Sequence, residues 1–366
     1  MLRINNWRFW LGLAVSILFV IILAYQVDLK EITAALGEAS YFYVAPAIGL
    51  YFIAVYFRSI RWRYLLAPVG AFPVNRLYPV VVMGYMANNL LPARLGELVR
   101  SYYLAKREGV SGSTALATIA VERVYDGVVL LAVAALAAPL LVLLGEFDGT
   151  SDAYRTAALT LAFGTVAVFL AALAFLTMAS FPWFLGMVDL GLRAVPARLR
   201  PRAREMSHRF IQGLGVLNSP RKHLGVFLLS LPVWLLEGAM YFLISYSFGI
   251  SGAFGSFWVL LLVIALLTAV SNLATALPTS IGGIGPFEVV AQQTLVALGV
   301  GASVAAVYAA FLHLVALWLP VNLVGLALLW KQNLSLRQLV KLDDAPDGEF
   351  TPGYRGNVPR PNEELS

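Results

Sequence analysis

The stretches that decide the fold are LPARLGE (91–97) and LPTSIGG (277–283). Each places proline and glycine inside a strongly apolar segment, where the bilayer normally requires uninterrupted helix because backbone groups without a partner are costly there. A second pair of similar strings follows the two stretches, GVS at 109–111 and GVG at 299–301, and each is followed by a long apolar span. Interrupted apolar segments at matching positions of two halves are typical of transporters, where they indicate a substrate site between the repeats.

The composition is that of a membrane protein. Hydrophobic residues make up 60% of the chain and charged residues 13%, against about 25% charged in soluble domains. With no cysteine and three scattered histidines, disulfides and structural zinc sites are not expected, and we expect neither a metal nor another cofactor. The net charge of +6 indicates contact with a membrane surface rather than with nucleic acid.

The apolar segments predict an all-α polytopic membrane protein. Segments of about 20 apolar residues are long enough to cross a bilayer, and they lie at 9–25, 41–57, 113–144, 157–179, 224–248 and 302–330. Two further segments, near 77–104 and 257–298, contain the breaks. If each of these is a re-entrant hairpin of broken helices, about six full transmembrane helices remain, the first of them retained rather than cleaved.

The loop charges support this count. One face of the membrane collects Arg3, Arg8, Arg58, Arg61, Arg63, Lys106, Arg107, the cluster 193–209, Arg221, Lys222, Lys331, Arg337 and Lys341. The opposite loops carry Asp28, Glu31, Glu38, Glu146, Asp148 and Asp152. By the positive-inside rule the basic face is cytoplasmic, so we expect a multi-pass protein of the cell membrane with both termini in the cytoplasm.

With three crossings and one hairpin in each half, we expect the second half to be an inverted repeat of the first; the alternative is that the two stretches match by coincidence, because Leu-Pro and Gly are common. The predicted organisation is a first repeat over 1–145, a second over 146–342 that contains a basic cytoplasmic segment at 180–223, and a disordered tail over 343–366. The two hairpins then enter from opposite faces, and their tips approach each other near the midplane. The basic segment either gathers anionic lipids at the leaflet surface or is an ordinary topology signal.

The breaks suggest a site for an anion. A helix that begins inside the membrane offers free N–H groups and a partial positive charge, and Pro92 and Pro286 suit the first position of such a helix. Arg94 lies beside the first break, and arginine binds phosphate through two parallel hydrogen bonds. The alternative is that the glycines and prolines only kink the helix and that Arg94 reaches the membrane surface.

A second group of charges lies inside the span 113–144, where charges are costly and mark a polar interior or pathway. Arg123 is spaced to pair with Asp126 along one helix, as Glu97 is with Arg100, so local neutralisation is the alternative to a site. Glu288 suits the first turn of the helix after Pro286, either as a cap or as a partner of a basic residue from the first half. Asn88, Asn89 and Asn272 are placed to bind backbone groups freed by the breaks, and His313 is expected to be a polar packing residue.

These residues form the predicted site. The residues expected to bind a lipid headgroup are Asn89, Arg94, Arg100, Arg123, Thr279, Ser280, Gly282, Gly283 and Gly285. The residues expected to balance charge or couple protons are Glu97, Glu122, Asp126 and Glu288. No catalytic residue is expected.

Three strings, LPARLGELVR (91–100), VERVYD (121–126) and LPTSIGGIGPFE (277–288), resemble the flippase-like transmembrane domain of lysylphosphatidylglycerol synthase. The resemblance covers roughly residues 8–330. It implies a polytopic lipid translocase domain that moves an aminoacylated phospholipid in the bifunctional members of the family, and a lipid or lipid-linked sugar in stand-alone relatives. About 35 polar residues follow the last span, so lysyl transfer by a soluble domain is not expected.

We therefore expect a transporter rather than an enzyme: a lipid translocase for an anionic or aminoacylated phospholipid or a polyprenyl-phosphate-linked glycan. One alternative is a membrane enzyme acting on lipid phosphates, against which stand the lack of an Asp-x-Asp pair and of paired histidines. The other is a non-catalytic membrane partner of a separate lipid- or glycolipid-synthesising enzyme.

Overall fold

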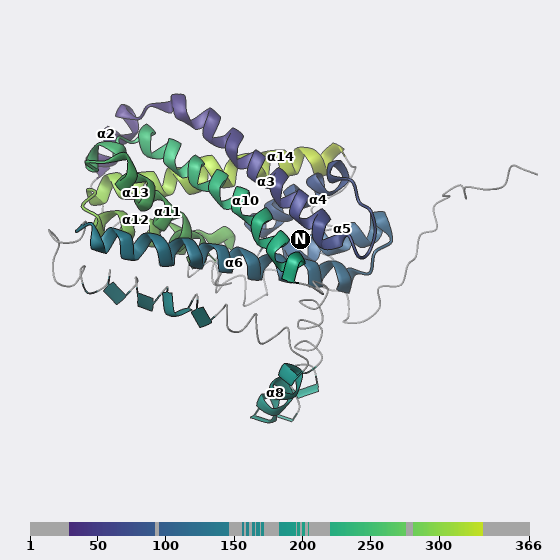
Figure 1. The fold of residues 1–366 in the computed structure, drawn as a ribbon. Helices are drawn as coiled ribbons and strands as arrows, with labels where there is room; N and C mark the ends of the chain where they lie inside the picture. The colour runs from purple at the N-terminus through teal and green to yellow at the C-terminus, as the bar shows by residue number, and fades with distance from the viewer. Residues whose placement is uncertain are drawn as a thin grey trace, which may run out of the picture.

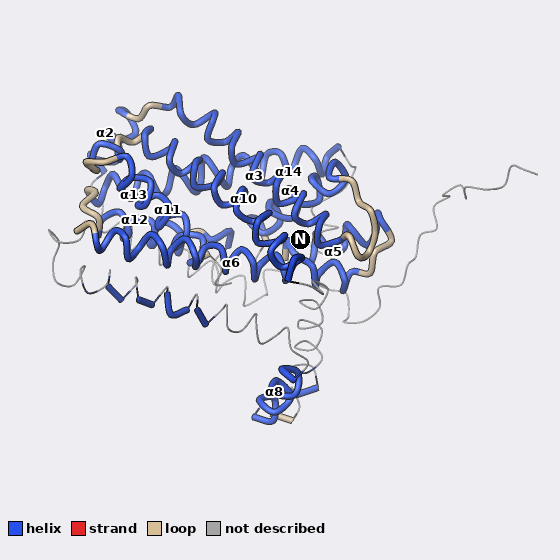
Figure 2. The backbone as a smooth tube through the Cα atoms, viewed as in Figure 1, coloured by secondary structure: helices blue, strands red, loops and turns tan. Residues whose placement is uncertain are grey.

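The computed structural model describes residues 29–91, 95–145, 220–275 and 281–331, together with scattered residues between 156 and 204. Within these residues the backbone is helix and loop only (Figure 2), which confirms the all-α class. Five described helices are long and apolar enough to cross a membrane: Tyr41–Leu66, Thr114–Leu143, Arg221–Ser247, Phe257–Ala274 and Ala302–Lys331. The predicted span 9–25 and most of 157–179 lie outside the described residues.

The helices follow one another along the chain as labelled in Figure 1. The first half contains α2 (Leu29–Glu38), η1 (Tyr41–Tyr43), α3 (Val44–Leu66), α4 (Val74–Leu90), α5 (Gly96–Glu108) and α6 (Gly112–Leu143). The second half contains α8 (Trp183–Gly191), η3 (Leu192–Ala194), α10 (Pro220–Ser247), η4 (Ile250–Ala253), α11 (Phe257–Ala274), η5 (Ile281–Gly283), α12 (Pro286–Ala297), α13 (Ala302–Ala310), η6 (Phe311–Trp318) and α14 (Leu319–Lys331).

Helices α3 and α10 lie side by side and run in opposite directions (Figure 1). At one end of the pair the Ser40 amide donates to the Ser247 carbonyl at 2.9 Å. Toward the other end, the Tyr64 hydroxyl lies against Gly225. One helix of each half therefore packs antiparallel against the other at the centre of the bundle.

Each half contains a hairpin of two helices separated by a break. Helices α4 and α5 pack together, and Arg76 near the start of α4 pairs with Glu108 at the end of α5 at 3.3 Å. This hairpin opens at the end of the bundle where α3 finishes. Helices α11 and α12 also pack together, and they open at the other end, where α10 finishes and α13 begins (Figure 1).

The two hairpins are followed by similar turns. Gly109 ends α5 with a φ of 67°, and Gly299 follows α12 with a φ of 87°, a left-handed conformation that glycine adopts without steric cost. The next helices begin after residues of nearly equal conformation, Ser111 (φ −57°, ψ 128°) and Gly301 (φ −56°, ψ 136°). The long helix of each half packs on the other half's hairpin, α6 on α11 and α14 on α4.

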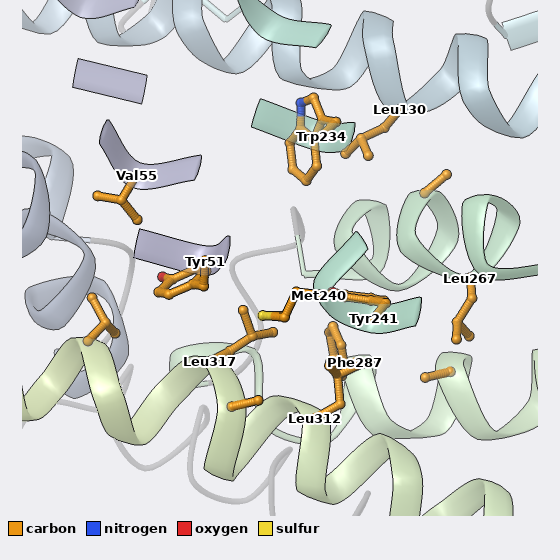
Figure 3. Packing of buried hydrophobic residues seen from close by; sticks show 14 of the residues in the cluster. Tyr51, Val55, Leu130, Trp234, Met240, Tyr241, Leu267, Phe287, Leu312 and Leu317 are labelled. Atoms are coloured by element: carbon orange, nitrogen blue, oxygen red, sulfur yellow. The ribbon is translucent and has the colours of Figure 1, made fainter. Parts of the chain in front are cut away.

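The apolar core joins both halves (Figure 3). Tyr51 and Val55 of α3 and Met240 and Tyr241 of α10 are buried with Phe287 at the start of α12. The ring centroids of Tyr241 and Phe287 lie 6.1 Å apart in an edge-to-face arrangement, which is a favourable geometry for aromatic pairs. The core thus fixes the second break against the central helix pair.

The structure changes two parts of the predicted topology. Arg58 and Arg61, which we placed in a cytoplasmic loop, lie inside α3 and are buried, because α3 continues to Leu66 instead of ending near residue 57. Helix α11, predicted as one arm of a re-entrant hairpin, is an 18-residue helix long enough to cross. Its length is compatible with a full crossing and with one arm of a re-entrant hairpin, so re-entry stays a prediction.

Candidate functional site

Two arginines of α3 anchor a charged cluster inside the bundle. Arg61 Nη1 lies 2.7 Å from Asp126 Oδ1, and Arg61 Nε lies 3.7 Å from Glu122 Oε1. Arg58 Nη2 lies 2.6 Å from Glu237 Oε2 of α10, and Arg58 Nη1 lies 3.7 Å from Asp126 Oδ2. The spacing of three residues puts both guanidinium groups on one face of α3, which faces α6 and α10.

Two ion pairs between helices α5 and α6 extend this cluster. Arg100 Nη2 lies 2.8 Å from Glu122 Oε2, and Arg123 Nε lies 3.4 Å from Glu97 Oε1. The structure therefore places Glu97 and Arg100 against charges of α6 rather than against each other. Arg123 Nη1 also lies 3.4 Å from Asp126 Oδ2, as their spacing predicts. We call this set the arginine network; its members are Arg58, Glu97, Arg61, Arg100, Glu122, Arg123, Asp126 and Glu237.

Small residues and aromatic rings shape the space around the network. A Cβ on Gly96 would lie 1.9 Å from the Gly84 carbonyl oxygen, and a Cβ on Gly84 would lie 2.3 Å from Arg100 Cγ. Only glycine at both positions lets α4 and α5 approach this closely while the Arg100 stem passes between them. The Arg100 guanidinium carbon lies 4.2 Å from the centre of the Trp62 ring, a favourable distance for a cation over an aromatic face.

Neutral polar groups complete the network. The Tyr85 hydroxyl on α4 accepts from Arg58 at 3.1 Å and from Arg123 at 3.4 Å. The Trp234 indole donates to Asp126 at 3.2 Å. Even so, Arg61 Nη2 and Arg100 Nε are buried and make neither a hydrogen bond nor one of these ion pairs with any residue that the structure describes. Unpaired buried donors are costly and uncommon in folded proteins, so these two N–H groups could bind an acceptor.

Burial divides the network into an inner and an outer part. The side chains of Arg58, Arg61 and Arg100 are 6%, 0% and 3% exposed. The outer pair, Arg123 and Glu97, is 27% and 25% exposed. The inner arginines are therefore enclosed by protein, whereas the outer pair can meet a ligand. Glu97 is the second residue of α5, after Gly96 and just beyond the first break.

At the second break a carboxylate closes the helix start. The Gly285 amide donates to Glu288 Oε2 at 2.7 Å, and Glu288 Oε1 lies 2.7 Å from His313 Nδ1. Glu288 thus caps its own helix, which was one of our two expectations, and its side-chain partner is His313 rather than a basic residue of the first half. A negative group already occupies the helix start, which disfavours the phosphate cradle expected at Gly282, Gly283 and Gly285.

The two breaks meet in the middle of the bundle. A Cβ on Gly282 would lie 2.9 Å from the Asn89 carbonyl oxygen and 3.0 Å from Trp318 Nε1. Asn89 Nδ2 lies 3.4 Å from Asn322 Oδ1. We call these four residues, Asn89, Gly282, Trp318 and Asn322, the break junction. The neighbouring Asn88 accepts from the Gly96 amide at 2.8 Å, so it satisfies a freed backbone group as predicted, whereas Asn272 donates to Tyr241 and Thr268.

The predicted site residues thus fall into three sets. Arg100, Arg123, Glu97, Glu122 and Asp126 belong to the arginine network, and Asn89, Gly282, Gly283, Gly285 and Glu288 lie at or beside the break junction. Arg94, Thr279 and Ser280 lie outside the described residues. Within the described part of the chain, no group of three His, Cys, Asp or Glu residues is arranged to hold a metal ion.

Sequence reasoning missed Arg58, Arg61 and Glu237. The signal was present, because Arg58 and Arg61 continue the helical pattern of an apolar segment and Glu237 is the only charged residue between Lys222 and the end of α10. Charges inside apolar spans usually face a polar interior. Applying that rule to α3 and α10, as it was applied to α6, would have found all three.

The basic segment is described only in part. Arg204 donates to both carboxylate oxygens of Asp189 on α8 at 2.9 and 2.7 Å. Helix α8 lies away from the other helices in Figure 1. The bidentate pair neutralises one of the arginines that were expected to attract anionic lipids.

Comparisons with known proteins agree with this membrane architecture. The chain matches the family described as "Lysylphosphatidylglycerol synthase TM region" over residues 9–324. It is 28% identical over 308 residues to a UPF0104 membrane protein of Methanothermobacter thermautotrophicus, which covers 81% of this chain and 87% of that protein. No solved structure matches the chain.

Another relative corrects one expectation. The chain is 28% identical over 323 residues to a Haloferax volcanii protein named Glycosyltransferase AglD, a match that covers 82% of this chain. The chain spans 50% of the length of that relative. A relative that bears the name of an enzyme overturns our exclusion of enzymes, which had rested on the lack of a soluble aminoacyl-transferase domain and of recognisable catalytic motifs.

The family match extends over all five apolar helices that are long enough to cross a membrane, apart from the last turns of α14. It also includes both breaks and every charged residue of the arginine network. The chain therefore belongs to the family of the lysylphosphatidylglycerol synthase transmembrane region.

Proposed function

We propose that this protein binds the phosphate of a lipid headgroup at Arg123 and moves that headgroup across the cell membrane. The observation that carries the proposal is the arginine network, which ends at a partly exposed Arg123–Glu97 pair. It also contains two buried arginine N–H groups, on Arg61 Nη2 and Arg100 Nε, that have no partner among the described residues. Charged groups within the apolar part of a membrane protein usually line a substrate path.

The charge balance of the network suits an exchange of anions. The four arginines face four carboxylates, so the apoprotein needs no added anion for neutrality. A phosphate that approaches Arg123 competes with the Glu97 carboxylate for the guanidinium group. Phosphate has the advantage of more acceptor oxygens. Displacement of Glu97 is thus the step at which headgroup binding is coupled to movement of α5.

The arrangement of the hairpins supports the transport part of the proposal. We propose that residues 1–145 and 146–342 are inverted repeats with re-entrant hairpins, because α3 and α10 are antiparallel and the hairpins open at opposite ends of the bundle. Such repeats place a substrate site at their interface, reachable from each side in turn. The acyl or prenyl chains would stay in the lipid while the headgroup passes between the repeats.

Liposomes that contain the purified protein test this proposal. Fluorescent analogues of an anionic phospholipid and of a polyprenyl phosphate are placed in both leaflets, and a membrane-impermeant quencher reports how fast the inner pool reaches the surface. We expect movement of one of these lipids with the wild type and at least a tenfold slower rate with Arg123→Ala. Arg76→Ala, which removes an arginine from an exposed pair with Glu108, is the matched control and should be unaffected.

Two results would reject the proposal: no movement of either lipid with the wild type, or equal rates with the wild type and Arg123→Ala. Arg123→Lys separates charge from geometry, because lysine keeps the charge but not the planar pair of donors. We expect this variant to recover part of the rate.

A second candidate function is glycosyl transfer to or from a lipid phosphate, favoured by the similarity to the protein named Glycosyltransferase AglD. The chain spans half of that relative, and the assay must decide whether the shared half is active. Incubation of the protein with polyprenyl phosphate and a nucleotide sugar, followed by mass spectrometry, would show a new lipid-linked sugar. Product that forms only when a separate synthase is added would favour a partner role.

A further inference from the structure

We infer that the break junction is a subsite for the uncharged sugar of a glycosylated lipid phosphate, an inference that rests on the proposed function and narrows its substrate class. The junction joins the two halves through Asn89, Gly282, Trp318 and Asn322. It is separate from the arginine network in its chemistry, because none of its four members carries a charge.

Two buried donors in the junction have no partner. Trp318 Nε1 and Asn322 Nδ2 are both buried and make no hydrogen bond in the part of the chain that the structure describes. Burying an N–H group without an acceptor is costly, and membrane interiors offer no water to replace it. Two such groups, four residues apart on the same helical run, are therefore placed for acceptors that arrive with a ligand.

The helix is distorted where it presents these donors. Residues Phe311–Trp318 form a π-helix, in which Leu319 N donates to Leu314 O. Wide turns of this kind are rare and are frequently found at functional sites. The distorted stretch holds His313 beside Glu288 and ends at Trp318, next to Gly282.

Nearby charge decides the class of ligand. Glu288 lies three residues after Gly285 and contacts His313 of the π-helix, and Phe287 stacks on the His313 ring with centroids 4.4 Å apart. A phosphate at the junction would meet the Glu288 carboxylate, whereas a sugar hydroxyl can both donate and accept. Hydroxyls can accept from Trp318 and Asn322 and donate to the amide oxygen of Asn89.

The junction is close enough to the network for one headgroup to reach both. Tyr85, which contacts Arg58 and Arg123, and Asn89 are one turn apart on α4. Four residues of α-helix rise about 6 Å. A phosphate at Arg123 and the sugar attached to it can therefore lie along α4, the phosphate beside Tyr85 and the sugar beside Asn89.

Binding of two related lipids by the purified full-length protein in detergent tests the inference. The probes are a short-chain polyprenyl monophosphate and the same lipid with one hexose on the phosphate. Loss of one hydrogen bond changes affinity by about three- to tenfold. We expect Trp318→Phe and Asn322→Leu to weaken binding of the hexosylated lipid by that factor and to leave the bare monophosphate unchanged. Arg123→Ala should weaken binding of both.

The control is Trp330→Phe, since Trp330 is 85% exposed at the end of the same helix. Equal binding of the hexosylated lipid by wild type, Trp318→Phe and Asn322→Leu, with tight binding of the bare monophosphate, would overturn the sugar subsite alone. Failure of the wild type to bind either lipid would overturn both the subsite and the phosphate site. Thermal unfolding shows whether Trp318→Phe or Asn322→Leu fails to fold. If one does, binding by the other tests the sugar subsite.

Discussion

The two halves of the molecule share the same order of helices and breaks, but the side chains around the two breaks differ in their chemistry. In each, a helix is followed by a break, a short helix, a glycine turn of positive φ and a long helix. In the first half the break lies beside arginines and carboxylates that pair between helices. In the second half the break lies beside amides, an indole and one histidine–glutamate pair.

The difference is clearest at the helix starts. Gly96 of α5 donates to the neutral amide of Asn88, whereas Gly285 before α12 donates to the carboxylate of Glu288. The start of α5 therefore keeps its partial positive charge for Glu97 or an incoming anion, and the start of α12 is already neutralised. A common scaffold can thus assign phosphate to one half and an uncharged group to the other.

The comparison between the halves depends most on their being inverted relative to each other in the membrane. Ser111 and Gly301 hold corresponding places before the long helices, and the chain has no cysteine. Single Ser111→Cys and Gly301→Cys variants should therefore react with a membrane-impermeant maleimide from opposite sides, Gly301→Cys from outside intact cells and Ser111→Cys only after lysis. Labelling of both from one side would refute the inverted arrangement.

The largest stability effect should come from the inner network. Arg61→Ala removes one buried cation from both Glu122 and Asp126, and breaking a buried ion pair costs about 3–5 kcal/mol. Unfolding in detergent should therefore occur at markedly lower temperature or denaturant concentration than for the wild type. Arg76→Ala is the control. If the two variants were equally stable, the inner arginines would be dispensable to the fold.

A somewhat smaller effect is expected where α4 and α5 touch. Gly96→Ala places a Cβ 1.9 Å from the Gly84 carbonyl oxygen, and a forced backbone shift of this kind costs about 1–3 kcal/mol. Gly127→Ala is matched to it, since Gly127 lies inside α6 with open space around its Cβ position. That control should be neutral or slightly stabilising. The same unfolding assay measures both, and a neutral Gly96→Ala would contradict the close contact.

The smallest effect should lie in the second half. Glu288→Gln keeps an oxygen that can accept from the Gly285 amide and loses only the charge that faces His313. We expect a loss of about 1 kcal/mol, the size of one net hydrogen bond. Glu122→Gln sharpens the comparison, because Glu122 lies between Arg61 and Arg100 and its charge should matter more. Equal losses would erase the proposed contrast between the halves.

Much of the architecture was predictable because proline, glycine and charge are rare in apolar helices. The positions of both breaks, the helix start at Pro286 and the Arg123–Asp126 pair all follow from local spacing. Partners across the bundle were not predictable. Glu97 and Arg100 suited each other by spacing, yet each pairs with α6, because the close α4–α5 contact fixes the face that α5 turns toward it.

The amino-acid sequence is enough to identify a helical membrane protein with two interrupted segments and charges inside its spans. Which charges meet depends on how the helices pack. Hydropathy assigned Arg58 and Arg61 to a cytoplasmic loop, but α10 supplies Glu237 and α6 supplies Asp126, so both arginines remain inside the bundle. The physical reason is that hydropathy sums a segment's own preference for lipid, whereas a buried charge is stabilised by partners from distant segments.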